Sequence, residues 1–237
     1  MLQLCCARHQ TLTMKHVLFI LTSADRVGRI AFKTGYEFSE VSNPYFDFIA
    51  NGMAVDFASP LGGCPPESGY DASIKANKDF RASSGFLRLG FSHKLSVVDI
   101  TAYDAIFFPG GLGPMVDLVD TEIVKKIIRQ VYENGGVVGA VCHGPAALLN
   151  VKLSNGCYLL DGKNVSCFTE AEELESKHHL GDVIPFLLDR TIREQGGNVI
   201  QEPPFQPCVV SDGRLVTGQN PASASPVANA MMRLMTR

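Results

Sequence analysis

Residues Gly135–Ala147, GGVVGAVCHGPAA, contain a complete strand–turn–helix pattern. The run Val137–Val141 has the composition of a short buried strand. Cys142 and His143 follow at the turn, and Gly144-Pro145 then opens a stretch of small residues in which a helix can begin. A reactive residue at such a turn, flanked by small neighbours, is typical of a nucleophile elbow in an α/β enzyme.

Similar apolar runs recur along the chain. They do not alternate with polar residues, which is typical of parallel strands covered on both faces. We expect strands at Val17–Leu21, Met53–Ala58, Ala105–Pro109 and Val137–Val141, with less complete patterns at Val165–Phe168 and Leu215–Thr217. The sequence therefore predicts an α/β fold: a doubly wound, mainly parallel, flavodoxin-like sheet with helices on both faces.

Two segments carry the clearest helix signals. Thr121–Asn134 places its apolar residues on one face and stops at Gly135-Gly136. The last helix is predicted to begin at Asn220, as the N-cap, with Pro221 in its first turn, and to continue through Leu234.

Two other segments interrupt the alternation of strand and helix. Lys33–Asn51 has a helical pattern but contains Pro44, which predicts a kink or a break there. Residues 61–103 are too long for a plain crossover, begin with the turn-rich LGGCPPESGYD and contain a predicted helix at Ala72–Phe80. We interpret them as a small cap-like insertion over the active site of a single domain, residues 14–237.

The composition limits the possible partners and compartments. The chain has 237 residues, 46% hydrophobic and 19% charged, and a net charge of -3 that gives no basic field for nucleic acid or acidic lipid. No apolar run approaches the roughly 20 residues of a membrane span. Residues 1–13 lack the apolar stretch of a signal peptide, so we expect a disordered leader and a soluble, cytoplasmic protein. Seven cysteines without CxxC spacing are interpreted as free thiols.

Cys142 is the candidate nucleophile. At a helix N-terminus, unpaired N–H groups and the helix dipole would stabilise its thiolate, and cysteines so placed have pKa values lowered to roughly 3.5–7.5. The alternative is a small buried apolar residue, as free cysteines commonly are. The elbow and the adjacent His143 favour the nucleophile. We expect the two side chains to diverge at the turn, which would keep His143 from reaching the sulfur well.

Phe107–Met115, FFPGGLGPM, offers a place for an oxyanion hole. Its strand ends at Gly110-Gly111, where backbone N–H groups can turn into the crevice at the carboxyl end of the sheet. The alternative is a tight turn that needs glycine for its dihedral angles. Beside a cysteine elbow the two interpretations combine, because the turn can also be the hole.

Four motifs together resemble the ThiJ/PfpI superfamily, which is related to class I glutamine amidotransferases. In chain order they are KTGYEFSEVSNPY (33–45), FFPGGLGPM (107–115), AVCHGPAAL (140–148) and LVTGQNPASA (215–224). The resemblance covers nearly everything from Met14 to the C-terminus. It is greatest to the glutathione-independent glyoxalase (glyoxalase III) branch, also described as heat-inducible chaperones, and it implies a homodimer.

The resemblance also implies roles for two acidic residues. The acidic partner of the nucleophile falls on Glu40, which would share a proton with Cys142. The acid that orients His143 falls on Glu173, with Glu172 as the alternative in a segment crowded with acidic residues.

One position departs from the branch, which usually has histidine after the two glycines of the oxyanion loop, where this chain has Leu112. A histidine contact to substrate or water is therefore expected to be missing. We also expect no metal: His178 and His179 are adjacent, so they point to different faces of a helix and are interpreted as a surface pair.

The expected activity is conversion of methylglyoxal, or a similar small 2-oxoaldehyde, to D-lactate or the hydroxy acid, without glutathione or a cofactor. Cys142 would add to the aldehyde, and backbone N–H groups near Gly111 and Gly144 would hold the oxyanion. Glu40 or His143 would move a proton between the two carbons. The alternatives are a redox-responsive holdase chaperone, a protein deglycase, and a cysteine peptidase or amidase.

Overall fold

The computed structural model describes residues 14–28, 31–176 and 183–236. The predicted leader, residues 1–13, and the pair His178-His179 lie outside these ranges. Within them, no helix has the length and apolar character needed to cross a bilayer.

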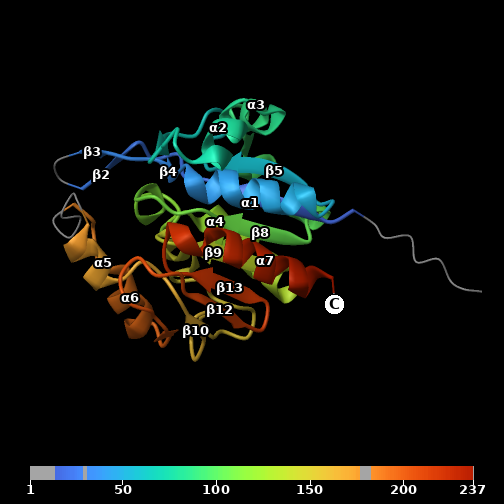
Figure 1. The fold of residues 1–237 in the computed structure, drawn as a ribbon. Helices are drawn as coiled ribbons and strands as arrows, with labels where there is room; N and C mark the ends of the chain where they lie inside the picture. Colours follow the sequence, from blue (N-terminus) through green and yellow to red (C-terminus); the bar gives the residue numbers. More distant parts are fainter. Residues whose placement is uncertain (1–13, 29–30, 177–182, 237) are drawn as a thin grey trace, which may run out of the picture.

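A seven-stranded sheet forms the centre of the protein (Figure 1). Its order is β12-β13-β9-β8-β1-β5-β7, and all neighbours are parallel except β12 and β13. The strands are β1 (His16–Ile20), β5 (Ala54–Ser59), β7 (His93–Lys94), β8 (Ala105–Phe108), β9 (Val137–Val141), β12 (Val209–Asp212) and β13 (Leu215–Gly218). Taken in chain order, β1, β5, β8, β9 and β13 have the 2-1-3-4-5 arrangement of flavodoxin-like sheets. The predicted fold class is confirmed.

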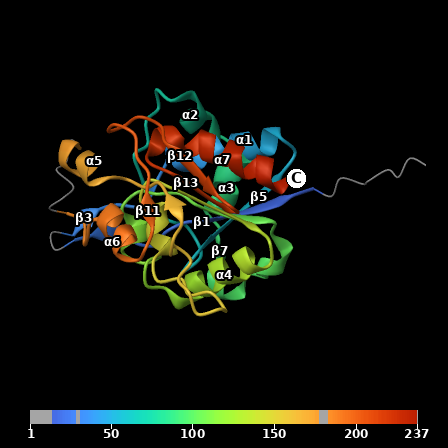
Figure 2. The same cartoon turned by 90° about the horizontal axis from the view of Figure 1, so that it is seen from below.

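Helices cover both faces of the sheet. Helices α1 (Ser39–Ala50) and α7 (Ala224–Met235) lie side by side on one face, and α4 (Glu122–Glu133) covers the other (Figures 1 and 2). The strands supply apolar side chains to both layers, because successive residues point in opposite directions. In β1, Phe19 belongs to the cluster with α1 and α7, whereas Leu18 belongs to the cluster with α4. Burying each such side chain stabilises the fold by about 1.5–3 kcal/mol.

Shorter elements surround this core. The two-residue strands are β2 (Arg26–Val27), β3 (Phe32–Lys33), β4 (Tyr36–Glu37), β6 (Glu67–Ser68), β10 (Asn164–Val165) and β11 (Asn198–Val199). The remaining α-helices are α2 (Lys75–Arg81), α3 (Ser84–Leu89), α5 (Glu170–Glu175) and α6 (Leu188–Glu194). Turns of 3₁₀ helix occupy Leu95–Val97, Ile100–Ala102, Gly113–Met115, Gly144–Leu148 and Pro221–Ser223.

The helix is not broken at Pro44, although a break is one of the two outcomes that the sequence predicts there. Pro44 lies inside the continuous helix α1 and removes one backbone hydrogen bond, because proline has no N–H to donate. The helix continues because Val41, Tyr45 and Phe48 are buried in the aromatic cluster beneath it. Packing thus outweighs the lost bond.

Asn220 holds the predicted N-cap position, but at a 3₁₀ turn, Pro221–Ser223, that leads directly into α7. The Asn220 side chain makes no capping bond. Its Nδ2 instead donates to Glu172 Oε1 at 2.8 Å, which connects the start of the last helix to α5.

The strand predicted at Val165–Phe168 is shorter than expected and lies outside the central sheet. Only β10 pairs, with β11. The following N–H groups bond elsewhere: Ser166 donates to Thr217 Oγ1 at 2.8 Å, and Phe168 donates to the Cys142 carbonyl at 2.9 Å. This segment therefore buttresses the elbow.

Most of residues 61–103 lies beside α1 and β5. Helix α2 packs on α1, α3 packs on β5, and β7 extends the central sheet (Figure 1). Strand β6 pairs with β4, and its Ser68, with the following Gly69, reaches the candidate site.

Candidate active site

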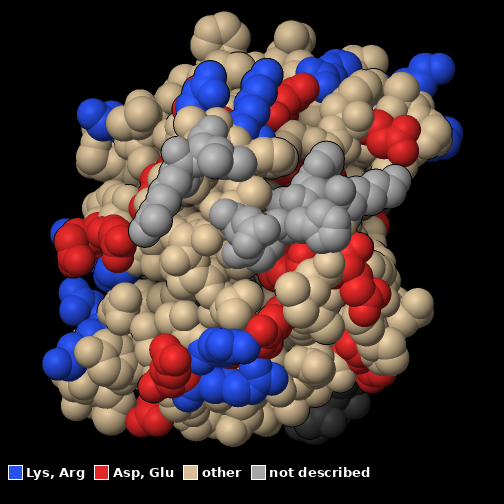
Figure 3. Space-filling view, turned by 90° about the vertical axis from the view of Figure 1, so that its left-hand side faces the viewer, with Lys and Arg blue, Asp and Glu red and all other residues tan. Residues whose placement is uncertain are grey.

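The elbow lies where the sequence predicts a crevice, at the carboxyl ends of the parallel strands. Cys142 follows β9, and Gly110 follows the neighbouring strand β8. This edge of the sheet is on the left in Figure 1 and faces the viewer in Figure 3. Acidic and basic side chains are interspersed on this face around uncharged residues (Figure 3).

Cys142 has a backbone conformation that L-amino acids rarely adopt. Its φ angle is 60°, in the left-handed region, which costs on the order of 1 kcal/mol or more for a residue with a side chain. Two hydrogen bonds hold it: its N–H donates to the Gly218 carbonyl and its carbonyl accepts from Phe168 N–H, both at 2.9 Å. A Cβ on Gly144 would lie 2.2 Å from the Phe108 carbonyl oxygen, so the turn needs glycine there.

His143 reaches the sulfur, contrary to the expected divergence of the two side chains. Its Nδ1 is 3.4 Å from Cys142 Sγ, because the left-handed turn brings these consecutive side chains together. Its Nε2 is 2.7 Å from Glu173 Oε1. The ring also packs against Phe168, with centroids 4.6 Å apart. Histidine and glutamate are both buried, so their orientation is well defined.

The structure distinguishes Glu173 from Glu172. Glu173 is the carboxylate that contacts His143. Glu172 belongs to a capping box at the start of α5: its Oε2 accepts from the Thr169 N–H and hydroxyl at 3.0 Å. The spacing Thr169-x-x-Glu172 is the sequence signature of that motif, and it could have assigned Glu172 to the helix start.

Glu40 lies beneath the turn and is completely buried. Its Oε2 accepts from Gly110 N–H at 2.6 Å, and its Oε1 has no partner with full hydrogen-bond geometry among the described residues. Burial raises the pKa of Glu40 well above its ordinary value, and the charge of Glu37 adds to this. A hydrogen bond with the Cys142 thiol acts in the opposite direction.

The expectation of a lowered pKa at Cys142 is not supported. Burial, followed by the charge of Glu40, raises the pKa of Cys142 well above its ordinary value, although Gly111 N–H opposes this. The segment after the turn is also a five-residue 3₁₀ turn, which provides little helix dipole. The two groups lie side by side, so a negative charge on either one disfavours a negative charge on the other.

The three glycines predicted to bind an oxyanion have different surroundings, and their N–H groups are not equally available. Gly111 lines the cavity, and interaction with its N–H lowers the pKa of Cys142. The N–H of Gly110 is already donated to Glu40. Gly144 packs against the Phe108 carbonyl and is not among the residues that line the cavity.

A cavity of about 410 Å³ opens onto Cys142 and His143. Its lining residues are Phe32, Lys33, Thr34, Glu37, Ser68, Gly69, Gly111, Leu112, Cys142, His143, Phe168 and Pro221. Leu112 clusters with Val27 and Val183, so an apolar wall stands where the branch usually has histidine. Sequence reasoning missed Glu37 and Phe168 as site residues. Glu37 lies in the same motif as Glu40, but nothing local indicates which carboxyl group faces the cavity.

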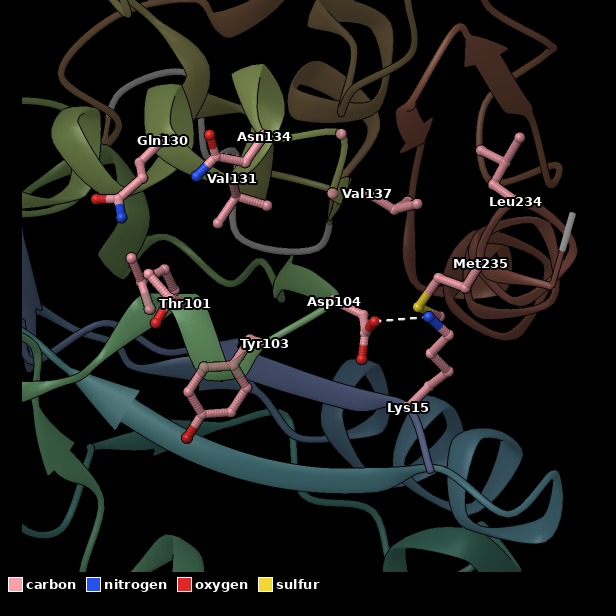
Figure 4. A pocket seen from close by; sticks show the side chains of 13 residues that line it. Lys15, Thr101, Tyr103, Asp104, Gln130, Val131, Asn134, Val137, Leu234 and Met235 are labelled. Carbon is pink, nitrogen blue, oxygen red and sulfur yellow. Dashed lines mark hydrogen bonds and ion pairs between the residues drawn. The ribbon is translucent and has the colours of Figure 1, made fainter. Parts of the chain in front are cut away.

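A second cavity, of about 300 Å³, lies at the opposite edge of the sheet, where β1, β8 and β9 begin (Figure 4). Lys15 and Asp104 form an ion pair at 2.7 Å on its wall. Val131, Val137 and Leu234 supply apolar side chains.

A buried cysteine, histidine and glutamate lie together on a flavodoxin-like sheet. This arrangement defines a class of α/β protein, and comparison of the chain with known proteins identifies that class. The sequence matches the DJ-1/PfpI family over residues 29–234, so the chain belongs to the DJ-1/PfpI family. The ThiJ/PfpI resemblance is thereby confirmed.

Relatives within the family are named as glyoxalases. "Glyoxalase 3" of Candida albicans is 32% identical over 211 residues, which cover 83% of this chain and 87% of that protein. The Schizosaccharomyces pombe protein named "Probable glutathione-independent glyoxalase hsp3103" is 40% identical over 139 residues, or 56% of this chain. The match spans about half of that relative, 53% of its length.

Solved structures agree with this assignment. The Rapid Encystment Protein 24 kDa of Francisella tularensis superposes with a TM-score of 0.88 and 35% identity, covering 94% of this chain and 99% of that one. Glyoxalase III from Candida albicans superposes with a TM-score of 0.82 and 29% identity, covering 93% and 97%.

Proposed function

We propose that this protein is a glutathione-independent glyoxalase that converts methylglyoxal, or a similar small 2-oxoaldehyde, to D-lactate or the corresponding hydroxy acid. The observation that carries the proposal is the grouping of Glu173, His143, Cys142 and Glu40, of which Cys142 and His143 line the cavity and the two glutamates lie behind them. The glyoxalase names of its relatives support the same reaction class.

The reaction begins with addition of Cys142 sulfur to the aldehyde carbon, C1, which gives a hemithioacetal. The N–H of Gly111 is our candidate donor for the new oxyanion, because Gly111 lines the cavity and the neighbouring Gly110 N–H is already donated to Glu40. Removal of the C1 proton and protonation of the ketone carbon, C2, give a thioester of Cys142. Water then hydrolyses the thioester and releases the hydroxy acid and the free thiol.

His143 and Glu40 have different roles in this scheme. Glu40 keeps a proton beside the sulfur, which permits a thiolate without two adjacent negative charges. His143 passes protons to and from the sulfur and the oxygens of the intermediate, oriented by Glu173. The proposed reaction requires no cofactor.

The test is lactate formation from methylglyoxal in the absence of glutathione. Cys142→Ser is expected to lower kcat/KM at least about 10³-fold, and Glu40→Gln about 10²-fold. Cys157→Ser is the matched control, because this cysteine is free and exposed, and it should retain full turnover. A wild-type protein that forms no lactate would reject the proposal.

The same preparations address the other functions. The 3.4 Å contact between His143 and the sulfur removes one argument against acyl transfer, so hydrolysis of peptide esters belongs in the assay. Release of free amines from methylglyoxal adducts measures deglycase action. Suppression of aggregation that survives Cys142→Ser would favour a chaperone. Sedimentation analysis tests the proposed homodimer.

A further inference from the structure

A second carboxyl group, that of Glu37, faces the candidate cavity. Glu37 lines the cavity together with Cys142 and His143, whereas Glu40 is completely buried and does not line it. The two glutamates come from the same motif, but Glu37 lies in β4 and Glu40 in the first turn of α1. The change from strand to helix at Phe38 gives their side chains different surroundings.

The surroundings of Glu37 hold it in place without neutralising it. Its backbone N–H donates to the Gly110 carbonyl at 3.0 Å, which fixes β4 against the oxyanion loop. The Ser39 hydroxyl donates to Oε1 at 3.3 Å. A Cβ on Gly69 would lie 2.0 Å from Oε2, so glycine leaves the room that this carboxyl group occupies. Among the described residues, no ion pair involves Glu37.

The proposed reaction needs a base that can touch the C1 hydrogen inside the cavity. Glu40 is committed to Gly110 N–H and lies below the sulfur. Both ring nitrogens of His143 are engaged, one by the Cys142 sulfur and the other by Glu173. Among the residues that the structure describes, Glu37 is the remaining carboxyl group on the cavity wall.

We propose that Glu37 is a catalytic residue that carries the proton from C1 to C2 of the hemithioacetal. This inference rests on the proposed glyoxalase function. As a carboxylate, Glu37 takes the C1 proton, and the C–H electron pair forms the C1=C2 double bond while the C2 oxygen takes the negative charge. Glu37 then returns the proton to C2 as the C1 hydroxyl proton passes to the C2 oxygen. The product is the Cys142 thioester, and no oxidant or reductant is required.

The electrostatics of the cavity agree with this role. Burial raises the pKa of Glu37 to about 7, so both protonation states are available near neutral pH. Within the described part of the chain, the charged or titratable groups that share its cavity or its field are Lys33, Cys142, His143 and Glu40. A general base with a pKa near the working pH contributes roughly 10²–10⁴ in rate.

The test compares Glu37→Gln with Glu37→Asp and, as a surface control on α5, Glu175→Gln. We expect Glu37→Gln to lower kcat about 10²-fold or more with KM changed only a few-fold, and Glu37→Asp to restore part of the loss. The kinetic isotope effect with aldehyde-deuterated methylglyoxal should rise in Glu37→Gln, because C1–H cleavage becomes more rate-limiting. The limb of the wild-type pH profile near pH 7 should disappear. Glu175→Gln should behave as wild type.

A separate measurement reports whether the site is intact. Alkylation of Cys142 by iodoacetamide should be as fast in Glu37→Gln as in wild type, or faster, since a negative charge near the thiol is removed. A Glu37→Gln protein with wild-type kcat, isotope effect and pH profile would overturn the role of Glu37 and leave the glyoxalase proposal standing. Absence of lactate from the wild type would overturn both.

Discussion

The carboxyl groups at the two cavities, which lie at opposite ends of the sheet, have different hydrogen-bond and ion-pair partners. At the amino end, Asp104 accepts hydrogen bonds from Lys15 Nζ at 2.7 Å and from His16 N–H at 2.9 Å (Figure 4). At the carboxyl end, Glu37 is half-buried and Glu40 is completely buried near Cys142, and neither makes an ion pair within the described ranges.

The pKa values follow this difference. Burial alone would raise the pKa of Asp104, but the bonds from Lys15 and His16 outweigh it and lower the pKa. Burial raises the pKa of Glu37 to about 7 and that of Glu40 well above its ordinary value. The ion pair of Asp104 thus stabilises the amino end of the sheet. Glu37 and Glu40 at the carboxyl end have no ion pair with any described residue, so their ionisation lowers the stability of the fold, and their raised pKa values suit them to proton transfer.

The largest expected difference between the two ends of the sheet is in how substitutions there change enzymatic activity. Glu173→Gln should lower kcat/KM about 10²–10⁴-fold, because His143 loses the charge that orients it and stabilises its protonated form. Asp104→Asn, at the other end, should leave turnover within two-fold of wild type. Glu172→Gln is the closest control: it weakens the capping box and should lower Tm more than activity. Equal losses of turnover in the three variants would remove the functional distinction.

The second expected difference between the two ends of the sheet is in how their carboxyl groups make protein stability depend on pH. The pKa of Glu37 is about 7 in the folded protein and 4.5 ordinarily, so the folded state binds more protons between these values. The stability of the wild type should therefore fall as pH rises from 4.5 to 7 and then level off. Glu37→Gln should be more stable by about 2–3 kcal/mol above pH 8 and equal near pH 4. Urea unfolding at several pH values measures this, and a pH-independent difference would contradict it.

Asp104 should show the opposite pH dependence. Its lowered pKa contributes stability that is present above the ordinary pKa of 3.8 and is lost as pH falls through the folded value. Because the side chain is about one-third exposed, we expect Asp104→Asn to cost only about 1 kcal/mol at pH 7 and less in high salt. A larger cost at pH 3 than at pH 7 would contradict this ion-pair account.

The smallest expected effect is at Gln130, which lines the amino-end cavity from α4 (Figure 4). Gln130→Ala should change the free energy of unfolding by less than about 0.5 kcal/mol, because it removes a partly exposed side chain from a helix that alanine favours. Turnover should be unchanged. A clear loss of activity would show that the amino-end cavity communicates with Cys142.

The sequence predictions were accurate where the structure depends on local patterns and less accurate where it depends on contacts between residues distant in the sequence. The apolar runs located β1, β5, β8, β9 and β13 within about a residue, because burial on both faces of a strand leaves a local pattern. No break occurs at Pro44, because tertiary packing holds helix α1 together against the local preference of proline. Asn220 holds the predicted N-cap position without a capping bond, and its amide group bonds to Glu172, 48 residues away.

The amino-acid sequence alone therefore indicated the sheet, the turn at Cys142 and the family, since hydrophobic periodicity and short motifs are local. The contact of His143 with the sulfur, the contact of Glu173 with His143 and the orientation of Glu37 toward the cavity required the three-dimensional structure. So did the raised pKa of Cys142, which a local helix-dipole argument predicts in the wrong direction. The physical reason is that desolvation and charge–charge distances depend on residues far apart in the chain, which only the folded protein brings together.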